Sequence, residues 1–307
     1  MSERQRLYRT HALILRRRDY RDADRILTIF TPNYGKLEVI AKGVRKTTSR
    51  KAGHLELFSH SSLLIAQART WDIVTEAVNV AGFTTLRANL DRIGMAGYLC
   101  ELVDCFTESG DENQPLWDLI LLALHELDNP VAPVSLLLLQ HWFELHLLSH
   151  TGFQPQLFQC LACDEELTPV TNFIHLAEGG VYCPNCAPQS QPIEPIDADV
   201  LKVMRFLQSR QWPVVRQVAV RPHILQRVGN LLYRYLLTIL ERHLKSVDFL
   251  RRLQHMPPPL APAQPISTVP ISTAPIRTDS ISTDSISTDS ISTDSISTEE
   301  TGPHAHP

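Results

Sequence analysis

Two cysteine pairs place the strongest constraint on how this chain can fold. Cys160 and Cys163 form one CxxC pair, Cys183 and Cys186 form a second, and 19 residues separate the pairs. A CxxC turn can present two thiolates to one metal ion, and two such turns complete a tetrahedral set of sulfur ligands. A chain that builds this site must bring the two pairs together in space.

The segment between the pairs favours a strand–turn–strand hairpin, as in a zinc ribbon. Residues 172–176 and 181–182 are the expected strands, with Gly179 and Gly180 in the turn. We therefore expect one structural Zn²⁺ ion in a module over residues 158–188. Two disulfides or an empty thiol site are the alternatives, but no stretch has the composition of a secretory signal. Four protein ligands leave no open position for a substrate, so a catalytic metal is not expected.

Positive charge is concentrated at the N-terminal end. Residues 1–51 contain 14 of the 29 Lys and Arg residues but five acidic ones, a local charge of +9. Residues 52–256 carry −8 and the remainder −5, so the net charge of −4 hides the basic segment. This asymmetry predicts a polyanionic partner for the N-terminal end. Neutralised phosphates and released counterions would supply most of the affinity for a nucleic acid, with little sequence preference.

We expect the phosphate contacts to come from two basic clusters, one around the end of the first strand and one in a loop over residues 42–51. The loop also carries glycine, serine and threonine, and Val44 is its clear apolar residue, so it is not a hidden core strand. The predicted DNA-binding residues are Arg16, Arg17, Arg18, Arg21, Lys36, Lys42, Arg45, Lys46, Arg50 and Lys51.

Four aromatic residues near these clusters are possible platforms for base stacking. They are Tyr8, Tyr20, Tyr34 and Phe58. Tyr34 is the best placed because it lies in a turn, and core packing is the alternative role for each of them.

The first 80 residues have the pattern of a small β-domain. Residues 36–42 alternate between apolar and polar side chains over most of their length, as a half-buried strand does. The expected strands are residues 8–18, 25–30, 36–42, 55–68 and 70–80. Five short strands favour a small barrel or an open sheet, with an OB-fold barrel as the leading candidate.

The pattern then changes to helical spacing. We expect helices over residues 84–106, 115–127, 134–150, 198–209 and 222–243. The chain is thus α+β, with an OB-fold domain over 1–80 and a mainly helical domain over 81–256 that carries the zinc module. Residues 257–307 are dominated by a five-residue repeat of Ile, Ser, Thr and Asp, which predicts a disordered tail.

Motifs of enzymes are not found in the sequence. There is no Walker loop and no GxGxxG. A zinc deaminase needs H-x-E before P-C-x-x-C, but His175 and Glu178 are separated by two residues and Tyr182 precedes Cys183. His141, His146, Cys100 and Cys105 are interpreted as packing residues on apolar helices. The chain is therefore not expected to be an enzyme. The most apolar segment, residues 134–148, is too polar and short for a membrane span, which favours a cytoplasmic protein.

Several segments resemble one known family. Residues 20–31 (YRDADRILTIFT), the pair Gly35 and Lys36, and residues 41–45 (AKGVR) are similar to the N-terminal signature of RecO proteins. Residues 143–148 (FELHLL) and 152–155 (GFQP), followed by Cys160, resemble the segment that leads into the zinc site of that family. The resemblance covers about residues 5–250 and leaves out the repeat tail.

The resemblance implies a mediator of DNA repair and homologous recombination in the cytoplasm, at the nucleoid. It implies binding of single- and double-stranded DNA, annealing of complementary strands, and loading of RecA together with RecR and single-strand-binding protein. The residues alone leave two other functions open: an RNA-binding or ribosome-associated protein, and a scaffold whose basic end meets an acidic protein. An unrecognised metalloenzyme is a more distant alternative.

Overall fold

The computed structural model describes residues 6–129, 135–247 and 250 of the 307-residue chain. By its internal contacts the chain divides into two units, Met1–Pro257 and Pro258–Pro307, and all described residues belong to the first. The tail predicted to be disordered over residues 257–307 lies outside the described residues.

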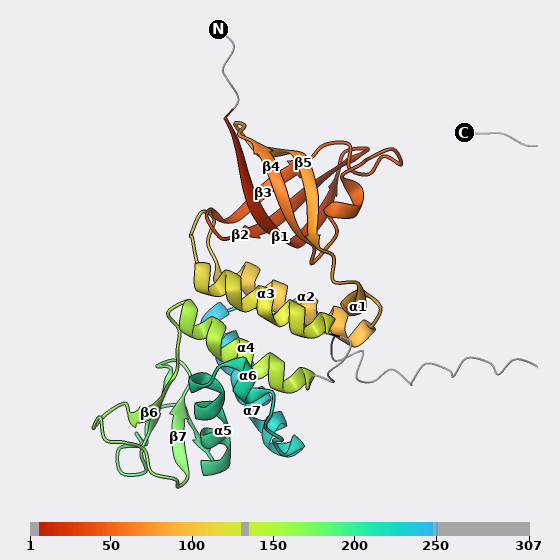
Figure 1. The fold of residues 1–307 in the computed structure, drawn as a ribbon. Helices are drawn as coiled ribbons and strands as arrows, with labels where there is room; N and C mark the ends of the chain where they lie inside the picture. Colours follow the sequence, from red (N-terminus) through yellow and green to blue (C-terminus); the bar gives the residue numbers. More distant parts are fainter. Residues whose placement is uncertain (1–5, 130–134, 248–249, 251–307) are drawn as a thin grey trace, which may run out of the picture. The chain divides into compact units, whose positions relative to one another are not determined.

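Five strands at the N-terminal end close into a barrel (Figure 1). They are β1 (Leu7–Tyr20), β2 (Asp24–Thr31), β3 (Gly35–Ala41), β4 (His60–Ala66) and β5 (Asp72–Ala81). The order is β1-β2-β3-β5-β4, and β4 returns to pair with β1. β3 and β5 pair in parallel, whereas the other pairs are antiparallel. A five-stranded barrel of this kind is an OB fold, which confirms the expected N-terminal fold.

Strand β1 is long enough to pair with two neighbouring strands. Its first half pairs with β4 and its second half with β2, with an irregularity between Ile14 and Arg16 where the register changes. The alternation expected for residues 36–42 is confirmed, because Val39 and Ala41 are fully buried in the barrel core. Side chains on one face of each strand thus point into the barrel, because successive side chains of a strand point to opposite faces of the sheet.

The segment before β4 differs from the expected strand over 55–68. A 3₁₀ helix (Ala52–His54) and a turn occupy the chain up to β4. Phe58 has a φ of +65° and is 7% exposed, within the apolar core. A positive φ interrupts a strand, and burial removes Phe58 from the possible stacking platforms.

Helices dominate the rest of the described chain. They are α1 (Thr84–Arg87), α2 (Leu90–Phe106), α3 (Gln114–Asp128), α4 (Leu136–His150), α5 (Ala198–Ser209), α6 (Trp212–Val215) and α7 (Pro222–Leu240). The helix expected over 84–106 is broken, because Asn89 leaves the helical conformation and its side chain accepts a hydrogen bond from the Arg92 N–H, as an N-cap does. Among the described residues, no helix could span a bilayer.

The barrel and the helices share one apolar core. Leu13, Leu15 and Phe30 from the barrel belong to the same buried cluster as the inward faces of α2, α3 and α4. The backbone of Gly35 pairs with that of Ser109 after α2, which joins the two parts by main-chain contacts as well. A domain boundary between residues 80 and 81 stays a prediction.

A small sheet is inserted between α4 and α5. It contains β6 (Gln156–Cys160), β7 (Asn172–His175), β8 (Gly180–Tyr182) and β9 (Ile193–Ile196) in the order β6-β8-β7-β9. The expected hairpin is present as β7 and β8, which pair in antiparallel register. β6 and β9 flank the hairpin and were not expected from the sequence.

A buried histidine at the start of β4 gives the fold a pH dependence. The His60 side chain is buried against Trp117, and its Nε2 lies 3.0 Å from Nδ1 of His11. Burial, together with the charges of His11 and His125, lowers the pKa of His60 from its usual 6.5 to about 4. The unfolded chain therefore binds more protons between pH 4 and 6.5, so the free energy of unfolding falls as pH drops through this window.

We expect His60→Gln to flatten this pH dependence, because glutamine does not titrate. The measurement is urea unfolding at a series of pH values between 4 and 7. The matched control is His223→Gln, since His223 is exposed on α7. An equally steep decline in His60→Gln and the wild type would contradict the role assigned to His60.

Candidate metal centre and nucleic-acid interface

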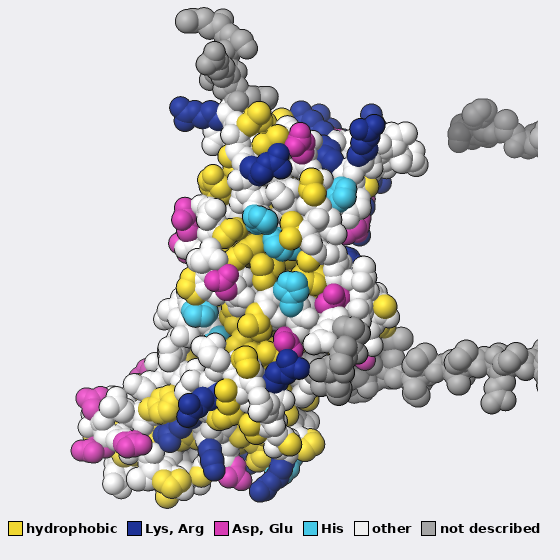
Figure 2. All heavy atoms as spheres, in the orientation of Figure 1, with side chains coloured by type: hydrophobic (Ala, Val, Ile, Leu, Met, Phe, Trp, Pro, Cys, Tyr) yellow, Lys and Arg dark blue, Asp and Glu magenta, His cyan; other side chains and the backbone are white. Residues whose placement is uncertain are grey.

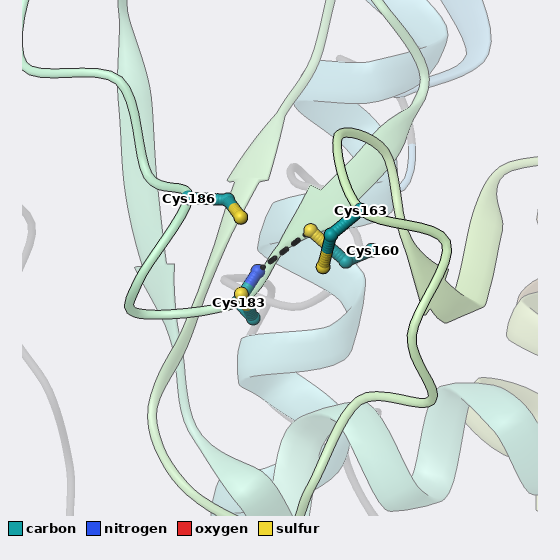
Figure 3. Close-up of side chains that lie close together, drawn as sticks. All are labelled: Cys160, Cys163, Cys183 and Cys186. Atoms are coloured by element: carbon teal, nitrogen blue, oxygen red, sulfur yellow. Dashed lines mark hydrogen bonds between the residues drawn. The ribbon is translucent and has the colours of Figure 1, made fainter.

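The four cysteines of the two CxxC pairs meet in the inserted sheet. Cys160 ends β6 and Cys183 follows β8, so the parallel pairing of these strands brings the two turns together. The four sulfur atoms all lie within 4.8 Å of one another, and Figure 3 shows that the side chains point toward one another from two loops. These residues could hold a metal ion.

The backbone around Cys160 favours its thiolate form. The Cys183 N–H donates a hydrogen bond of 3.3 Å to Cys160 Sγ (Figure 3). Burial by itself would raise the pKa of Cys160, but backbone N–H groups of Cys183, Ala162 and Cys163 lower the pKa to about 6. Because the thiolate is the form that binds metal, backbone amides of both cysteine turns prepare Cys160 for ligation.

Two glycines allow the cysteine turns to approach. Gly179 has a φ of +69° in the β7–β8 turn, and a Cβ at that position would lie 2.7 Å from Tyr235 Oη. A Cβ on Gly180 would lie 2.5 Å from the Leu161 side chain, which belongs to the first cysteine turn. The turn is confirmed at Gly179, whereas Gly180 is the first residue of β8. The lack of a side chain at Gly179 lets α7 pack close, and at Gly180 it lets the first cysteine turn pack close.

The basic loop after β3 is held to the barrel by a few specific contacts. Val44 is 1% exposed and belongs to the barrel core. The Gly43 N–H donates to the Asp24 carboxylate at 2.7 Å, and the Arg45 N–H donates to the carbonyl of Ala23 at 2.9 Å. These contacts fix the loop beside the β1–β2 turn, so its charges have a defined place on the surface.

Three cations of this loop face solvent without an acidic partner. Lys42, Lys46 and Arg50 are all exposed. Within the described part of the chain, no carboxylate lies within salt-bridge distance of them. On the face drawn in Figure 2, Lys and Arg side chains also gather over the barrel. A cation without a partner gives up no existing ion pair when it binds phosphate.

Three other predicted contacts are engaged inside the protein. Lys36 Nζ lies 3.3 Å from the Asp104 carboxylate and donates to the Asp104 carbonyl at 2.5 Å. Arg17 pairs with Glu56. Lys51 donates to the Val74 carbonyl at 2.8 Å, and burial lowers its pKa.

The remaining four predicted contacts are exposed and make weaker interactions. Arg16, Arg18 and Arg45 lie 3.5–3.7 Å from Asp104, Glu38 and Asp19, respectively. Arg21 is also exposed, with its guanidinium 5.2 Å from the centre of the Tyr20 ring. Exposed ion pairs contribute about 0–1 kcal/mol, so DNA phosphates could compete for these arginines.

The aromatic residues form two pairs on the barrel. Tyr8 and Tyr34 have ring centres 4.7 Å apart, and Tyr8 Oη donates to the Asp72 carboxylate at 2.8 Å. Tyr20 lies beside Trp71, with ring centres 5.4 Å apart at 75°. Trp71 was missed because it lies within an expected strand, 51 residues away from Tyr20, and only the tertiary pairing brings the two rings together.

Family comparisons identify the chain. The family model described as Recombination protein O N terminal matches residues 1–83, and the model described as Recombination protein O C terminal matches residues 87–248. The chain belongs to the RecO family. The two RecO matches meet at α1, between β5 and α2, and together they cover nearly all of the described residues.

Curated RecO relatives agree with this assignment. The DNA repair protein RecO of Roseiflexus sp. (strain RS-1) is 40% identical over 253 residues, which cover 82% of this chain and 88% of the relative. The DNA repair protein RecO of Dehalococcoides mccartyi (strain ATCC BAA-2266 / KCTC 15142 / 195) is 33% identical over 246 residues, covering 80% and 96%. The similarity therefore extends across the barrel, the helices and the cysteine module.

Proposed function

We propose that this RecO protein is a mediator of DNA repair and recombination that binds single- and double-stranded DNA through its barrel. In this role it anneals complementary strands and, with RecR, helps load RecA onto DNA covered by single-strand-binding protein. It acts in the cytoplasm at the nucleoid and performs no catalytic step. The observation that carries the proposal is the exposed set of Lys42, Lys46 and Arg50 on an OB-fold barrel, for which the described residues provide no carboxylate partner.

The proposed mechanism of annealing is electrostatic. Two DNA strands repel each other, and residues 1–51 carry a local charge of +9. A small basic domain can hold both backbones while their bases search for register, because it neutralises phosphates of either strand without reading sequence. Among the ten predicted contacts, we rank Lys42, Lys46 and Arg50 first. Arg16, Arg18, Arg21 and Arg45 come second, and Arg17, Lys36 and Lys51 come last because they are engaged inside the protein.

We further propose that the four cysteines hold one structural Zn²⁺ ion. The sulfur atoms of a tetrahedral four-thiolate zinc site lie roughly 3.8 Å apart, which fits four sulfurs within 4.8 Å of one another. Thiolates are soft ligands that select zinc over magnesium or calcium. The ion would cross-link the turns after β6 and β8, and a full set of protein ligands leaves it no part in catalysis.

The test is fluorescence anisotropy of a labelled single-stranded DNA titrated with the full-length protein at several salt concentrations. We expect the logarithm of the affinity to fall steeply with the logarithm of salt concentration. Combined reversal by Lys42→Glu, Lys46→Glu and Arg50→Glu should weaken binding equally for unrelated sequences. It should also reduce the slope by about 2, since each phosphate contact contributes roughly 0.7 on a single strand.

The matched control reverses three exposed cations outside the barrel: Lys202, Arg210 and Arg221. This variant has the same net charge as the first, so it should retain the affinity and slope of the wild type if the barrel loop is the binding site. Equal loss in both variants would show a general charge effect, and loss restricted to particular sequences would contradict phosphate binding. No binding by the folded wild type at low salt would favour a protein partner for the basic end, and tighter binding of RNA would favour an RNA-related role.

A further inference from the structure

Two aromatic side chains in contact, each with an arginine over its ring, lie on the barrel. The Arg21 guanidinium is 5.2 Å from the Tyr20 ring centre, the Tyr20 ring is 5.4 Å from Trp71, and the Arg18 guanidinium is 5.9 Å from the Trp71 ring centre. We call these four residues the Trp71 ladder. Arg18 and Arg21 are exposed, while both aromatic rings keep part of their surface in solvent.

The ladder joins two connections of the barrel. Tyr20 ends β1 and Arg21 begins the turn to β2, whereas Trp71 closes the loop between β4 and β5. The parallel pairing of Val39 in β3 with Asp72 in β5 places Trp71 beside the second half of β3, close to where the basic loop begins. The basic loop reaches the same place, because the Arg45 side chain donates to the Arg21 carbonyl at 3.4 Å.

We propose that the Trp71 ladder is a subsite that stacks unpaired nucleobases, so that the chain grips single strands by their bases as well as by their phosphates. The inference rests on the DNA-binding function proposed above and identifies the unpaired nucleobases as the part of the DNA that this site binds. Aromatic side chains in nucleic-acid channels stack bases of any sequence, and arginine adds cation–π attraction.

The composition of the ladder matches the chemistry of a single strand, with two rings for the bases and two flanking arginines for the phosphates. The Arg18 guanidinium lies over the Trp71 ring, 5.9 Å from its centre, so a base that stacks on that face would displace an exposed arginine. A base could stack on the ring while the displaced arginine meets the adjoining phosphate. Bases in a duplex are already stacked and paired, so this contact favours unpaired DNA.

The other aromatic pair is less suited to this role. Tyr8 is half-buried and its hydroxyl is bound to the Asp72 carboxylate. The described residues place no Lys or Arg over either ring of the Tyr8–Tyr34 pair. Without a cation for the adjoining phosphate, Tyr34 serves as the control position, although it is 39% exposed.

The experiment compares the binding of two oligomers of equal length and charge, oligothymidylate and an abasic tetrahydrofuran oligomer, to the full-length protein at several salt concentrations. We expect the wild type to bind oligothymidylate about tenfold tighter or more, since stacking on each aromatic contributes this much. Trp71→Ala should bring the ratio close to one while the salt slope stays unchanged. Trp71→Phe should keep part of the ratio, and Tyr34→Ala should keep all of it.

A fluorescence readout keeps the test independent of how well Trp71→Ala folds. The other three of the four tryptophans are Trp117, Trp142 and Trp212, which are 5%, 2% and 2% exposed. Quenching of tryptophan fluorescence by DNA therefore reports mainly on Trp71. We expect oligothymidylate to quench it, the abasic oligomer not to quench it, and Trp71→Phe to lose the quenching while it still binds DNA.

The outcomes separate the subsite from the function on which it rests. If the folded wild type binds neither oligomer at low salt, the proposed DNA binding itself fails. Equal affinity of the wild type for both oligomers would overturn the stacking subsite and leave phosphate binding intact. A preference for oligothymidylate that persists in Trp71→Ala, or is lost in Tyr34→Ala, would place stacking elsewhere on the barrel.

Discussion

Cys160→Ser is expected to abolish binding of the proposed Zn²⁺ ion, unfold the cysteine module and lower the melting temperature by about 10–20 °C. Cys160 is 1% exposed and belongs to the main apolar core together with Ile174 and Val181 of the hairpin. Loss of a structural metal is among the mechanisms that reach on the order of 4–5 kcal/mol for a single substitution, and 1 kcal/mol is worth roughly 2–4 °C in a chain of this size. Metal content after gel filtration and thermal unfolding followed by circular dichroism measure the two effects.

Cys105→Ser is the matched control for this prediction. Cys105 is half-buried on α2, outside the cluster of four cysteines. The Cys105→Ser variant should still bind the proposed Zn²⁺ ion and should keep nearly all of its thermal stability. Chelation of the wild type should reproduce the effect of Cys160→Ser, because both remove the same cross-link. Full metal content in Cys160→Ser would contradict the assigned ligand set.

The effect on DNA binding should follow folding rather than precede it. Cys160 lies in the inserted sheet, whereas the proposed contacts lie on the barrel and its loops. DNA affinity in Cys160→Ser should therefore fall only as far as the folded fraction falls. A fully folded Cys160→Ser variant that does not bind DNA would contradict the prediction that DNA binding is lost only through unfolding.

Gly35→Ala is the second large effect, with an expected loss of about 3 kcal/mol or more of unfolding free energy. Gly35 has a φ of +58°, and a Cβ there would lie 2.1 Å from the carbonyl oxygen of Asp111. The atoms that the Cβ would meet are the backbone O, C and N of Asp111, so no side-chain rotation can relieve the clash. Opening the gap would separate β3 from the segment after α2, where Gly35 pairs with Ser109. Urea unfolding at neutral pH measures the loss.

Gly110→Ala is the control that distinguishes the cost of the steric clash from the cost of a positive φ at alanine. Gly110 lies in the same segment with a φ of +80°, but a Cβ there would meet nothing within 4 Å. It should lose only the cost of a left-handed alanine, roughly 1–2 kcal/mol. Equal losses in Gly35→Ala and Gly110→Ala would mean that the close approach of the barrel to the helices is not required.

Local patterns predicted most of the elements because their causes are local. The alternation around Val39 determines which side chains can face a barrel interior, and the spacing of the four cysteines limits how their turns can meet. The predicted elements are wrong where a single residue ends the regular backbone conformation of its segment. Asn89 caps a new helix inside a continuous apolar pattern, and Phe58 turns the chain with a positive φ before β4.

The sequence by itself therefore determined the OB-fold strands, the meeting of the cysteine pairs and the basic character of the N-terminal end. Only the tertiary structure decided which charges are available, since Lys36 meets Asp104 across 68 residues while Lys42 keeps no such partner among the described residues. It also decided that Trp71 joins Tyr20. Charge and residue spacing can be read from a single segment of the sequence. Side-chain contacts between distant residues depend on which segments the barrel brings together, and the local periodicity of a segment contains no information about these contacts.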